Sequence, residues 1–181
     1  MRILVTGFEP FGGSDTNITQ NILSILPTQI DNMEIVTTCL PVSFLQAPLV
    51  LRQTIHQYQP DIVMNLGQCN VGDNVRLERF AMNMMDCQKP DNDGYMPSEE
   101  IIYPQAELAY KTPIALKEIQ SQCEAKQLPV VVSNSAGLYV CNRVYYEALY
   151  NQHNALFVHI PKNMDVTLAA HIVLQIITEG L

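Results

Sequence analysis

Residues Pro129–Val144 read PVVVSNSAGLYVCNRV, and this stretch decides the fold that the sequence predicts. Its first four residues, Pro129–Val132, are apolar and mostly β-branched, as in a short buried strand. Small polar residues and a glycine then indicate a turn. Leu138–Tyr150 follows with the pattern of a helix. The unit is therefore strand, turn and helix, and Cys141 lies early in that helix.

Cys141 has the position of a reactive thiol. Backbone N–H groups and the helix dipole stabilise negative charge at a helix N-terminus, which favours the nucleophilic thiolate. His159 follows in the strand-like FVHIP, and Glu78 lies upstream in RLERFAMN. A cysteine nucleophile, a histidine base and an orienting carboxylate are the parts of a cysteine hydrolase. Taken singly, a packed Cys, a core His and an exposed Glu78–Arg79 ion pair are the commoner readings.

Composition excludes several classes of function. The 181 residues suffice for one α/β domain with a sizeable core. A net charge of −8 argues against a nucleic-acid partner, because phosphate backbones repel an acidic protein. No apolar run approaches the ~20 residues of a membrane span, and MRILVTGFEP does not resemble a signal peptide. Charged residues are only 15% of the chain, which suggests that partner subunits cover part of the surface.

The cysteines and histidines give no sign of a disulfide framework or a metal site. The five cysteines are odd in number, irregularly spaced and without a CxxC pair, which is typical of free thiols in a reducing compartment. The four histidines form no HExxH motif and no zinc-type pairing with cysteine. We therefore expect a cytoplasmic protein with neither metal nor cofactor.

Strands and helices alternate along the chain. The expected strands are Arg2–Thr6, Met33–Leu40, Asp61–Leu66, Pro129–Val132 and Ala155–Ile160, with Val75–Met84 as an extended strand or a hairpin arm. The expected helices are Asn17–Leu26, Ser43–Tyr58, Thr112–Lys126, Leu138–Tyr150 and Asp165–Thr178, with Lys89–Tyr103 as a surface loop. This alternation predicts one α/β domain over residues 1–181, a three-layer αβα sandwich around a mostly parallel twisted sheet.

Some helix positions carry a more specific expectation. Thr16 or Asn17 caps the first helix, and Asp165 caps the last. Pro48 disturbs the second helix locally, whereas Pro113 lies in the first turn of the third.

The chemically distinctive segments fall at strand ends. In open α/β sheets, sites form at the carboxyl ends of the strands. GFEPFGG, Gly67–Gln68, the turn before Cys141 and His159 all lie at or near such ends. The sequence therefore predicts that these segments converge.

Together these stretches resemble the pyroglutamyl peptidase I family of cysteine peptidases, also called pyrrolidone-carboxylate peptidases. The motifs that carry the resemblance are LVTGFEPFGG at Leu4–Gly13, NLGQ at Asn65–Gln68, LERFAMN at Leu77–Asn83, KPDNDG at Lys89–Gly94, SNSAGLYVCN at Ser133–Asn142 and FVHIP at Phe157–Pro161. They occur in the family's order and cover nearly the whole chain.

The resemblance implies a function and a set of site residues. The substrates would be peptides with an N-terminal pyroglutamate, cleaved through a thioester on the cysteine. Glu78, Cys141 and His159 would form the catalytic triad, and the lactam ring would lie between Phe8 and Phe11. Substrate binding would also involve Gln68 and Gln88, and the chain would assemble as a homotetramer without a cofactor.

The chain departs from the family at the mouth of this site. Gln88 stands where the family has an active-site arginine, and Lys89 beside it would point the other way if the segment is extended. Cys69, Asn70 and Val71 replace small residues. Two alternatives therefore remain open: a cysteine amidase for another small lactam or acyl group, and a binding protein whose triad is vestigial.

Overall fold

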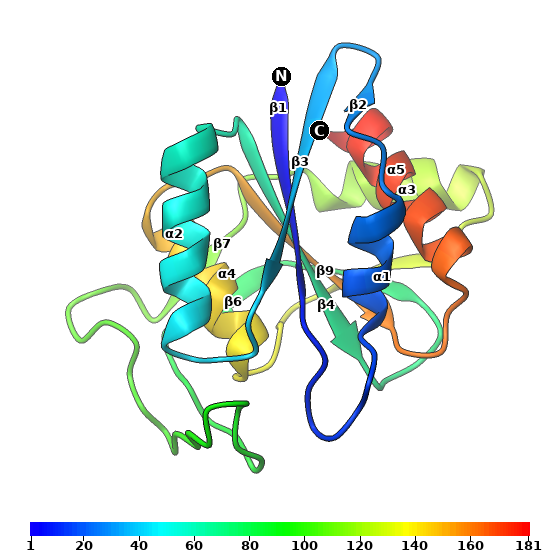
Figure 1. The fold of residues 1–181 in the computed structure, drawn as a ribbon. Coiled ribbons are helices and arrows are strands. Elements are labelled where there is room, and N and C mark those ends of the chain that lie inside the picture. The colour runs from blue at the N-terminus through cyan, green and yellow to red at the C-terminus, as the bar shows by residue number, and fades with distance from the viewer.

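The computed structural model describes the whole chain, residues 1–181 (Figure 1). Seven strands form one sheet in the order β2-β3-β1-β4-β9-β5-β8, and β6 and β7 form a separate antiparallel ribbon. The strands are β1 (Arg2–Phe8), β2 (Gln29–Ile30), β3 (Met33–Leu40), β4 (Ile62–Cys69), β5 (Val75–Glu78), β6 (Phe80–Met82), β7 (Ala109–Lys111), β8 (Val130–Ser133) and β9 (Ala155–Pro161). The helices are α1 (Ile18–Ile25), α2 (Gln46–Tyr58), α3 (Leu116–Ala125), α4 (Val140–Tyr150) and α5 (Val166–Gly180).

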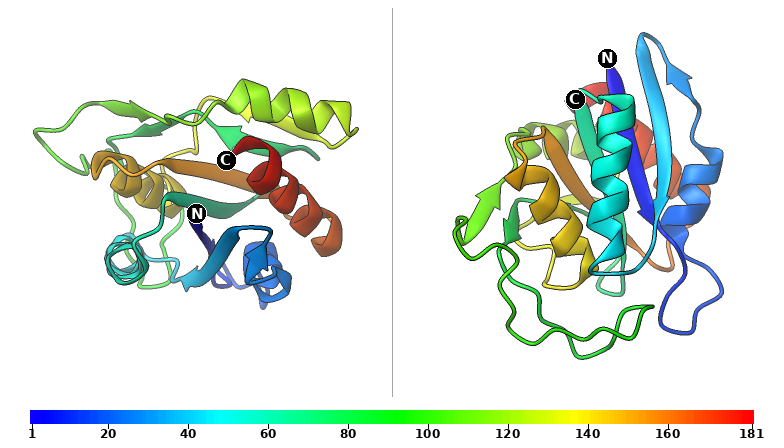
Figure 2. Two further views of the ribbon diagram at one scale, coloured as in Figure 1. Left: turned by 90° about the horizontal axis from the view of Figure 1, so that it is seen from above. Right: turned by 60° about the vertical axis from the view of Figure 1, so that its left-hand side comes forward.

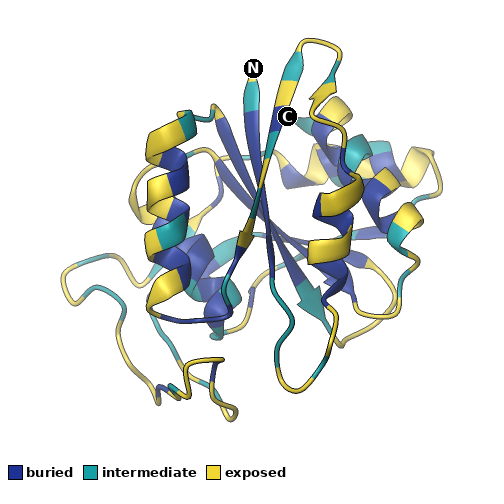
Figure 3. Cartoon of the chain, in the orientation of Figure 1, coloured by how far each residue is buried: buried dark blue, intermediate teal, exposed yellow.

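Helices cover both faces of the sheet, which confirms the predicted three layers. One apolar core lies between the sheet and α1, α3 and α5, and a second lies between the sheet and α2 and α4. Figure 2 shows these two groups of helices on opposite sides of the strands. The central strands are dark along their length in Figure 3, whereas α1, α2, α3 and α5 each keep an exposed side and α4 is buried around most of its circumference. Burial of these apolar faces stabilises the fold.

The sheet is mostly parallel, as predicted, but three of its strands run in the opposite direction: the short β2 at one edge, and β5 and β8 at the other. β3, β1, β4 and β9 run in one direction, so their carboxyl ends share one edge. β5 is antiparallel to β9, and β8 follows the direction of β5. The turn before Cys141 therefore does not begin at the shared carboxyl edge, contrary to the prediction. Residues 134–139 instead carry the chain back toward β4 and β9.

Several predicted boundaries shift for local reasons. α2 begins at Gln46, so Pro48 lies in its first turn, where a missing N–H breaks no helical bond, and the expected disturbance is absent. α3 begins only at Leu116, so Pro113 precedes the helix. Val75–Met84 divides at Arg79 into β5 and β6, which belong to different sheets. The short β2 and β7 were not predicted.

The predicted caps are confirmed at two helices. The Asn17 side chain accepts a hydrogen bond from the Thr19 amide at the start of α1. The Asp165 side chain accepts one from the Leu168 amide at the start of α5. Each bond satisfies a helical N–H that has no backbone partner. None of the helices combines the length and apolar character needed to cross a membrane.

Candidate active site

His159 and Glu78 meet across the antiparallel pairing of β9 and β5. The Nδ1 atom of His159 lies 2.8 Å from Oε1 of Glu78. Both residues are buried, with exposed fractions of 8% for His159 and 1% for Glu78. The hydroxyl of Tyr145, on α4, donates to the backbone carbonyl of Glu78 at 2.9 Å. The reversed direction of β5 thus brings the predicted carboxylate to the predicted histidine, and α4 holds it there.

His159 is poised to carry a positive charge at neutral pH. Burial alone lowers its pKa, but the interactions with Cys141 and with Glu78 outweigh that effect and raise the pKa to about 10. The second carboxylate oxygen of Glu78, Oε2, is buried and accepts no hydrogen bond. The imidazole is therefore the one hydrogen-bond partner of this carboxylate side chain within the structure.

Cys141 is the second residue of α4, which confirms its predicted position near a helix start. The helix begins at Val140, two residues later than predicted, with Tyr139 as the cap residue. Tyr139 makes no side-chain capping bond, so the N–H groups of the first turn remain available to a negative charge. The buried Asn142 fixes the helix start by accepting from the Met82 amide and donating to the Met82 carbonyl, at 2.8 and 2.9 Å.

Gly67 on β4 makes room for the thiol. A Cβ atom at this position would lie 3.0 Å from Sγ of Cys141 and 2.7 Å from two ring carbons of Phe157. No side chain fits there without displacing one of these groups. The absence of a side chain at Gly67 therefore lets Cys141 approach the sheet between β4 and β9.

A cavity of about 130 Å³ lies in front of Cys141 and His159. Phe8, Phe11 and Gln68, all predicted as substrate-binding residues, line it. Five further lining residues were not predicted: Asn17, Val42, Ala136, Tyr139 and Val140. Of these, Tyr139 and Val140 directly precede Cys141 in sequence, which was a signal that could have revealed them.

Tyr139 forms an aromatic wall of the cavity. Its ring packs against Phe11, with 6.2 Å between ring centroids, and edge-on against Phe44 at 5.3 Å. Its hydroxyl donates to the Pro90 carbonyl at 3.0 Å, and burial raises its pKa to about 12. The ring thus joins the start of α4 to the loop that follows β6.

Gln68 connects the cavity to the first loop of the chain. Its Oε1 accepts from the Ile18 amide at 3.2 Å, at the start of α1. Its amide nitrogen donates no hydrogen bond within the protein, so it is a free donor at the cavity wall. Asn17 donates to the Glu9 carbonyl at 3.0 Å and so fixes the loop that carries Phe11.

Gln88 does not line the cavity with Cys141. It is exposed and lines an adjoining hollow, together with Lys89. The condition under which Lys89 was expected to point away from Gln88 is not met, because the backbone bends at both residues instead of running extended. Of the site residues named from the sequence, the structure thus brings together Glu78, Cys141, His159, Phe8, Phe11 and Gln68, and Gln88 stands at the outer edge.

Comparison with known proteins agrees with this site. The family described as pyroglutamyl peptidase matches residues 1–173. The pyrrolidone-carboxylate peptidase of Thermococcus kodakarensis is 37% identical over 174 residues, covering 93% of this chain and 84% of the relative. The corresponding enzyme of Lactobacillus johnsonii is 38% identical over 167 residues, covering 89% and 78%.

Solved structures give the same result. The pyrrolidone carboxyl peptidase of Fervidobacterium islandicum superposes with a TM-score of 0.94 at 32% identity, over 100% of both chains. That of Thermococcus litoralis gives 0.94 at 30% identity, covering 99% of this chain and 92% of the other. The sequence motifs, the fold and the family match coincide, and this chain belongs to the pyroglutamyl peptidase family.

Proposed function

We propose that this chain is a cysteine peptidase that removes N-terminal pyroglutamate from peptides, with Cys141, His159 and Glu78 as its catalytic residues. The observation that carries the proposal is a thiol and a carboxylate-paired imidazole at the wall of one small, aromatic-lined cavity. The relatives of this chain are named pyrrolidone-carboxylate peptidases. A small, flat, neutral lactam suits such a cavity.

Acylation begins with the thiolate of Cys141. Its sulfur attacks the carbonyl carbon that joins pyroglutamate to the next residue, and the carbonyl π electrons move onto the oxygen. The free N–H groups at the start of α4 stabilise this oxyanion. When the oxyanion collapses, the C–N bond breaks and the imidazolium of His159 gives its proton to the departing amine.

Deacylation reverses the role of His159. The imidazole, now neutral, takes a proton from a water molecule as that water attacks the thioester. The C–S bond then breaks, free pyroglutamate leaves, and the thiolate and imidazolium are restored. Glu78 holds Nδ1–H through the 2.8 Å hydrogen bond, so Nε2 is the atom that exchanges the proton.

Binding of the lactam follows from the cavity walls. Phe8 and Phe11 supply apolar ring surface, and the free amide donor of Gln68 suits the lactam carbonyl. Gln88 lines the adjoining hollow, and we propose that it contacts the peptide beyond the lactam.

The test is cleavage of a chromogenic pyroglutamyl amide by the purified protein. We expect turnover that Cys141→Ser reduces by about 10³-fold or more, since a hydroxyl at neutral pH is a much weaker nucleophile. Iodoacetamide should inactivate the enzyme in step with labelling of Cys141, and Cys39→Ser on the exposed face of β3 is the matched control. Full turnover by Cys141→Ser would contradict the assignment.

We also propose that the protein works in the cytoplasm as a homotetramer. All five cysteines are free thiols, which suits a reducing compartment. Large apolar side chains are exposed at the start of α2 and in the segment after β6, among them Leu45 at 61%, Met96 at 55% and Leu108 at 77%. Size-exclusion chromatography with light scattering measures the molar mass of the assembly. The mass of a monomer would contradict the proposed tetramer.

A further inference from the structure

A second hollow, of about 410 Å³, opens directly beside the catalytic cavity. The two share Phe11, Gln68 and Tyr139 as walls. The catalytic cavity, at about 130 Å³, is far below the volume that holds a drug-sized ligand, so it accepts one small ring and no more. The part of the substrate that follows the scissile bond must therefore lie outside the catalytic cavity. The adjoining hollow is the space next to it, because the two share walls.

The charge of this hollow contrasts with the rest of the molecule. Lys89 and Lys162 line it, and no Asp or Glu does. Neither lysine belongs to any of the ion pairs of the structure. The net charge of the whole chain is −8, whereas this hollow beside the catalytic cavity has two positively charged side chains without acidic partners. The local charge is therefore opposite in sign to the net charge of the protein.

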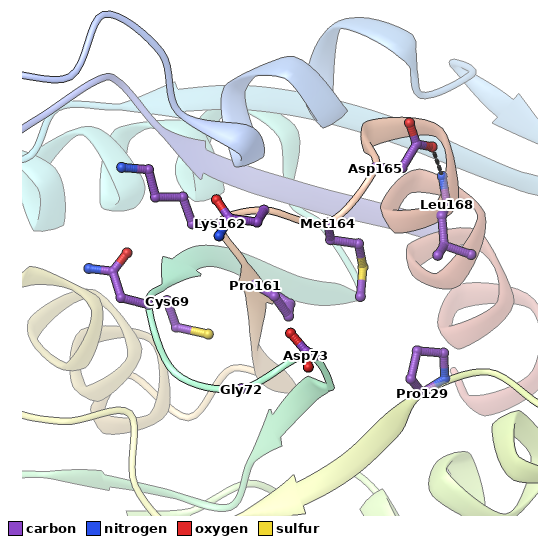
Figure 4. A pocket seen from close by; sticks show the side chains of 11 residues that line it. Cys69, Gly72, Asp73, Pro129, Pro161, Lys162, Met164, Asp165 and Leu168 are labelled. Atoms are coloured by element: carbon purple, nitrogen blue, oxygen red, sulfur yellow. Dashed lines mark hydrogen bonds between the residues drawn. The ribbon is translucent and has the colours of Figure 1, made fainter.

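The two lysines come from segments far apart in the chain. Lys162 directly follows the carboxyl end of β9, three residues after His159, and its backbone amide donates to the Cys69 carbonyl at 2.8 Å. Lys162 also borders the next hollow, which Asp73 and Asp165 line, and Figure 4 shows its side chain extended away from Asp73. The backbone bends at Lys89, and the residue lines the same hollow as Gln88.

We propose that this hollow binds the residue that follows pyroglutamate and that Lys89 and Lys162 select a carboxylate on it. The carboxylate is either the side chain of an acidic residue or the terminal carboxylate of a pyroglutamyl dipeptide. This inference rests on the proposed pyroglutamyl peptidase activity. Both ammonium groups are exposed, so each contributes modestly, and together they should favour the charged substrate by roughly 3- to 10-fold in kcat/KM at low salt.

The experiment compares three substrates of nearly equal shape. They are pyroglutamyl-glutamine amide, which is neutral; pyroglutamyl-glutamate amide, with a side-chain carboxylate; and pyroglutamyl-glutamine, with a terminal carboxylate. We expect one or both charged substrates to exceed the neutral one, and the excess to shrink as salt is raised. Which of the two exceeds it identifies the source of the carboxylate.

The variants attribute the preference to the lysines. In the double variant Lys89→Gln/Lys162→Gln the ratio of charged to neutral kcat/KM should approach one. In Lys89→Glu/Lys162→Glu it should fall below one. Lys117→Gln, which removes an exposed charge from α3 on another part of the molecule, should keep the original ratio. All these side chains are exposed, so the variants should fold, and melting curves verify this.

Two results overturn the proposal while leaving the peptidase assignment intact: a ratio near one in the unmodified enzyme, or a preference that survives in the double variant. Failure to cleave any of the three substrates would overturn both the proposal and the activity on which it rests.

Discussion

The replacement Glu78→Gln tests how the protein sets the charge of His159. Oε1 of the carboxylate lies 2.8 Å from Nδ1, and the other oxygen, Oε2, accepts no hydrogen bond, so the substitution removes a full charge without breaking further hydrogen bonds of that side chain. An opposite charge at such a distance raises the pKa of a histidine by about 1–3. The pKa of His159, raised to about 10 in the native protein, should therefore fall to about 7–9 in the variant.

The sign of the effect on activity follows from the mechanism. The imidazolium must donate a proton to the leaving amine, so activity declines as pH rises through the pKa of His159. We expect the alkaline limb of the kcat/KM profile near pH 10 in the native enzyme and at lower pH in Glu78→Gln. The rate at the optimum should also fall, by about 10³- to 10⁴-fold, because Gln can donate to Nδ1 and stabilise the wrong tautomer.

Stability should change with pH in the same direction. Because the folded-state pKa of His159 is raised above its ordinary value of about 6.5, the pair contributes fully below pH ~6.5 and its contribution is lost as pH rises through about 10. In Glu78→Gln the decline in Tm should begin at the same pH, about 6.5, but end at lower pH and be smaller. Glu118→Gln, on the exposed surface of α3, removes the same formal charge elsewhere and is the control. An alkaline limb that stays near pH 10 in Glu78→Gln would refute the reasoning.

Three further outcomes are expected. Gly67→Ala forces a methyl group against Phe157 and Cys141, so it should cost about 1–3 kcal/mol of stability and lower Tm by about 2–12 °C. It should also lower kcat by a larger factor than it changes KM. An unchanged Tm in thermal melting together with unchanged kcat and KM in steady-state assays would contradict the tight fit. Gln88→Arg should raise kcat/KM on pyroglutamyl substrates at unchanged Tm if the neutral amide weakens the enzyme, whereas equal or lower activity in a folded variant means that Gln88 serves this chain's own substrate. Prolonged dialysis against EDTA should leave kcat unchanged, and a loss restored by added zinc would disprove metal independence.

The sequence was sufficient for the elements and for most of the site, because local signals dominate there. The apolar strand before Ser133 and the polar turn that follows required a strand–turn–helix unit, so Cys141 had to lie near a helix start. The caps at Asn17 and Asp165 were equally local, since a side chain satisfies an amide two or three residues away.

What could not be predicted depends on long-range pairing. The reversal of β5 and β8 has no local signature, because a strand's direction is set by its neighbours in the sheet. The tie between Tyr145 and the Glu78 carbonyl joins residues far apart in the chain and emerges only after that pairing. For the same reason the sequence could not show that Lys89 and Lys162 face one space.

The strand order has a consequence for how the protein is made. β4 and β5 are consecutive in the chain, yet β9 lies between them in the sheet. Until β9 joins the sheet, the other six strands belong to two separate groups, β2-β3-β1-β4 and β5-β8, each with an unpaired inner edge. Exposed strand edges of this kind invite pairing between chains. The strand that closes this gap, Ala155–Pro161, also delivers His159, so completion of the sheet and onset of catalysis are one event, and enzyme activity measured during synthesis would report the moment at which the aggregation-prone edges disappear.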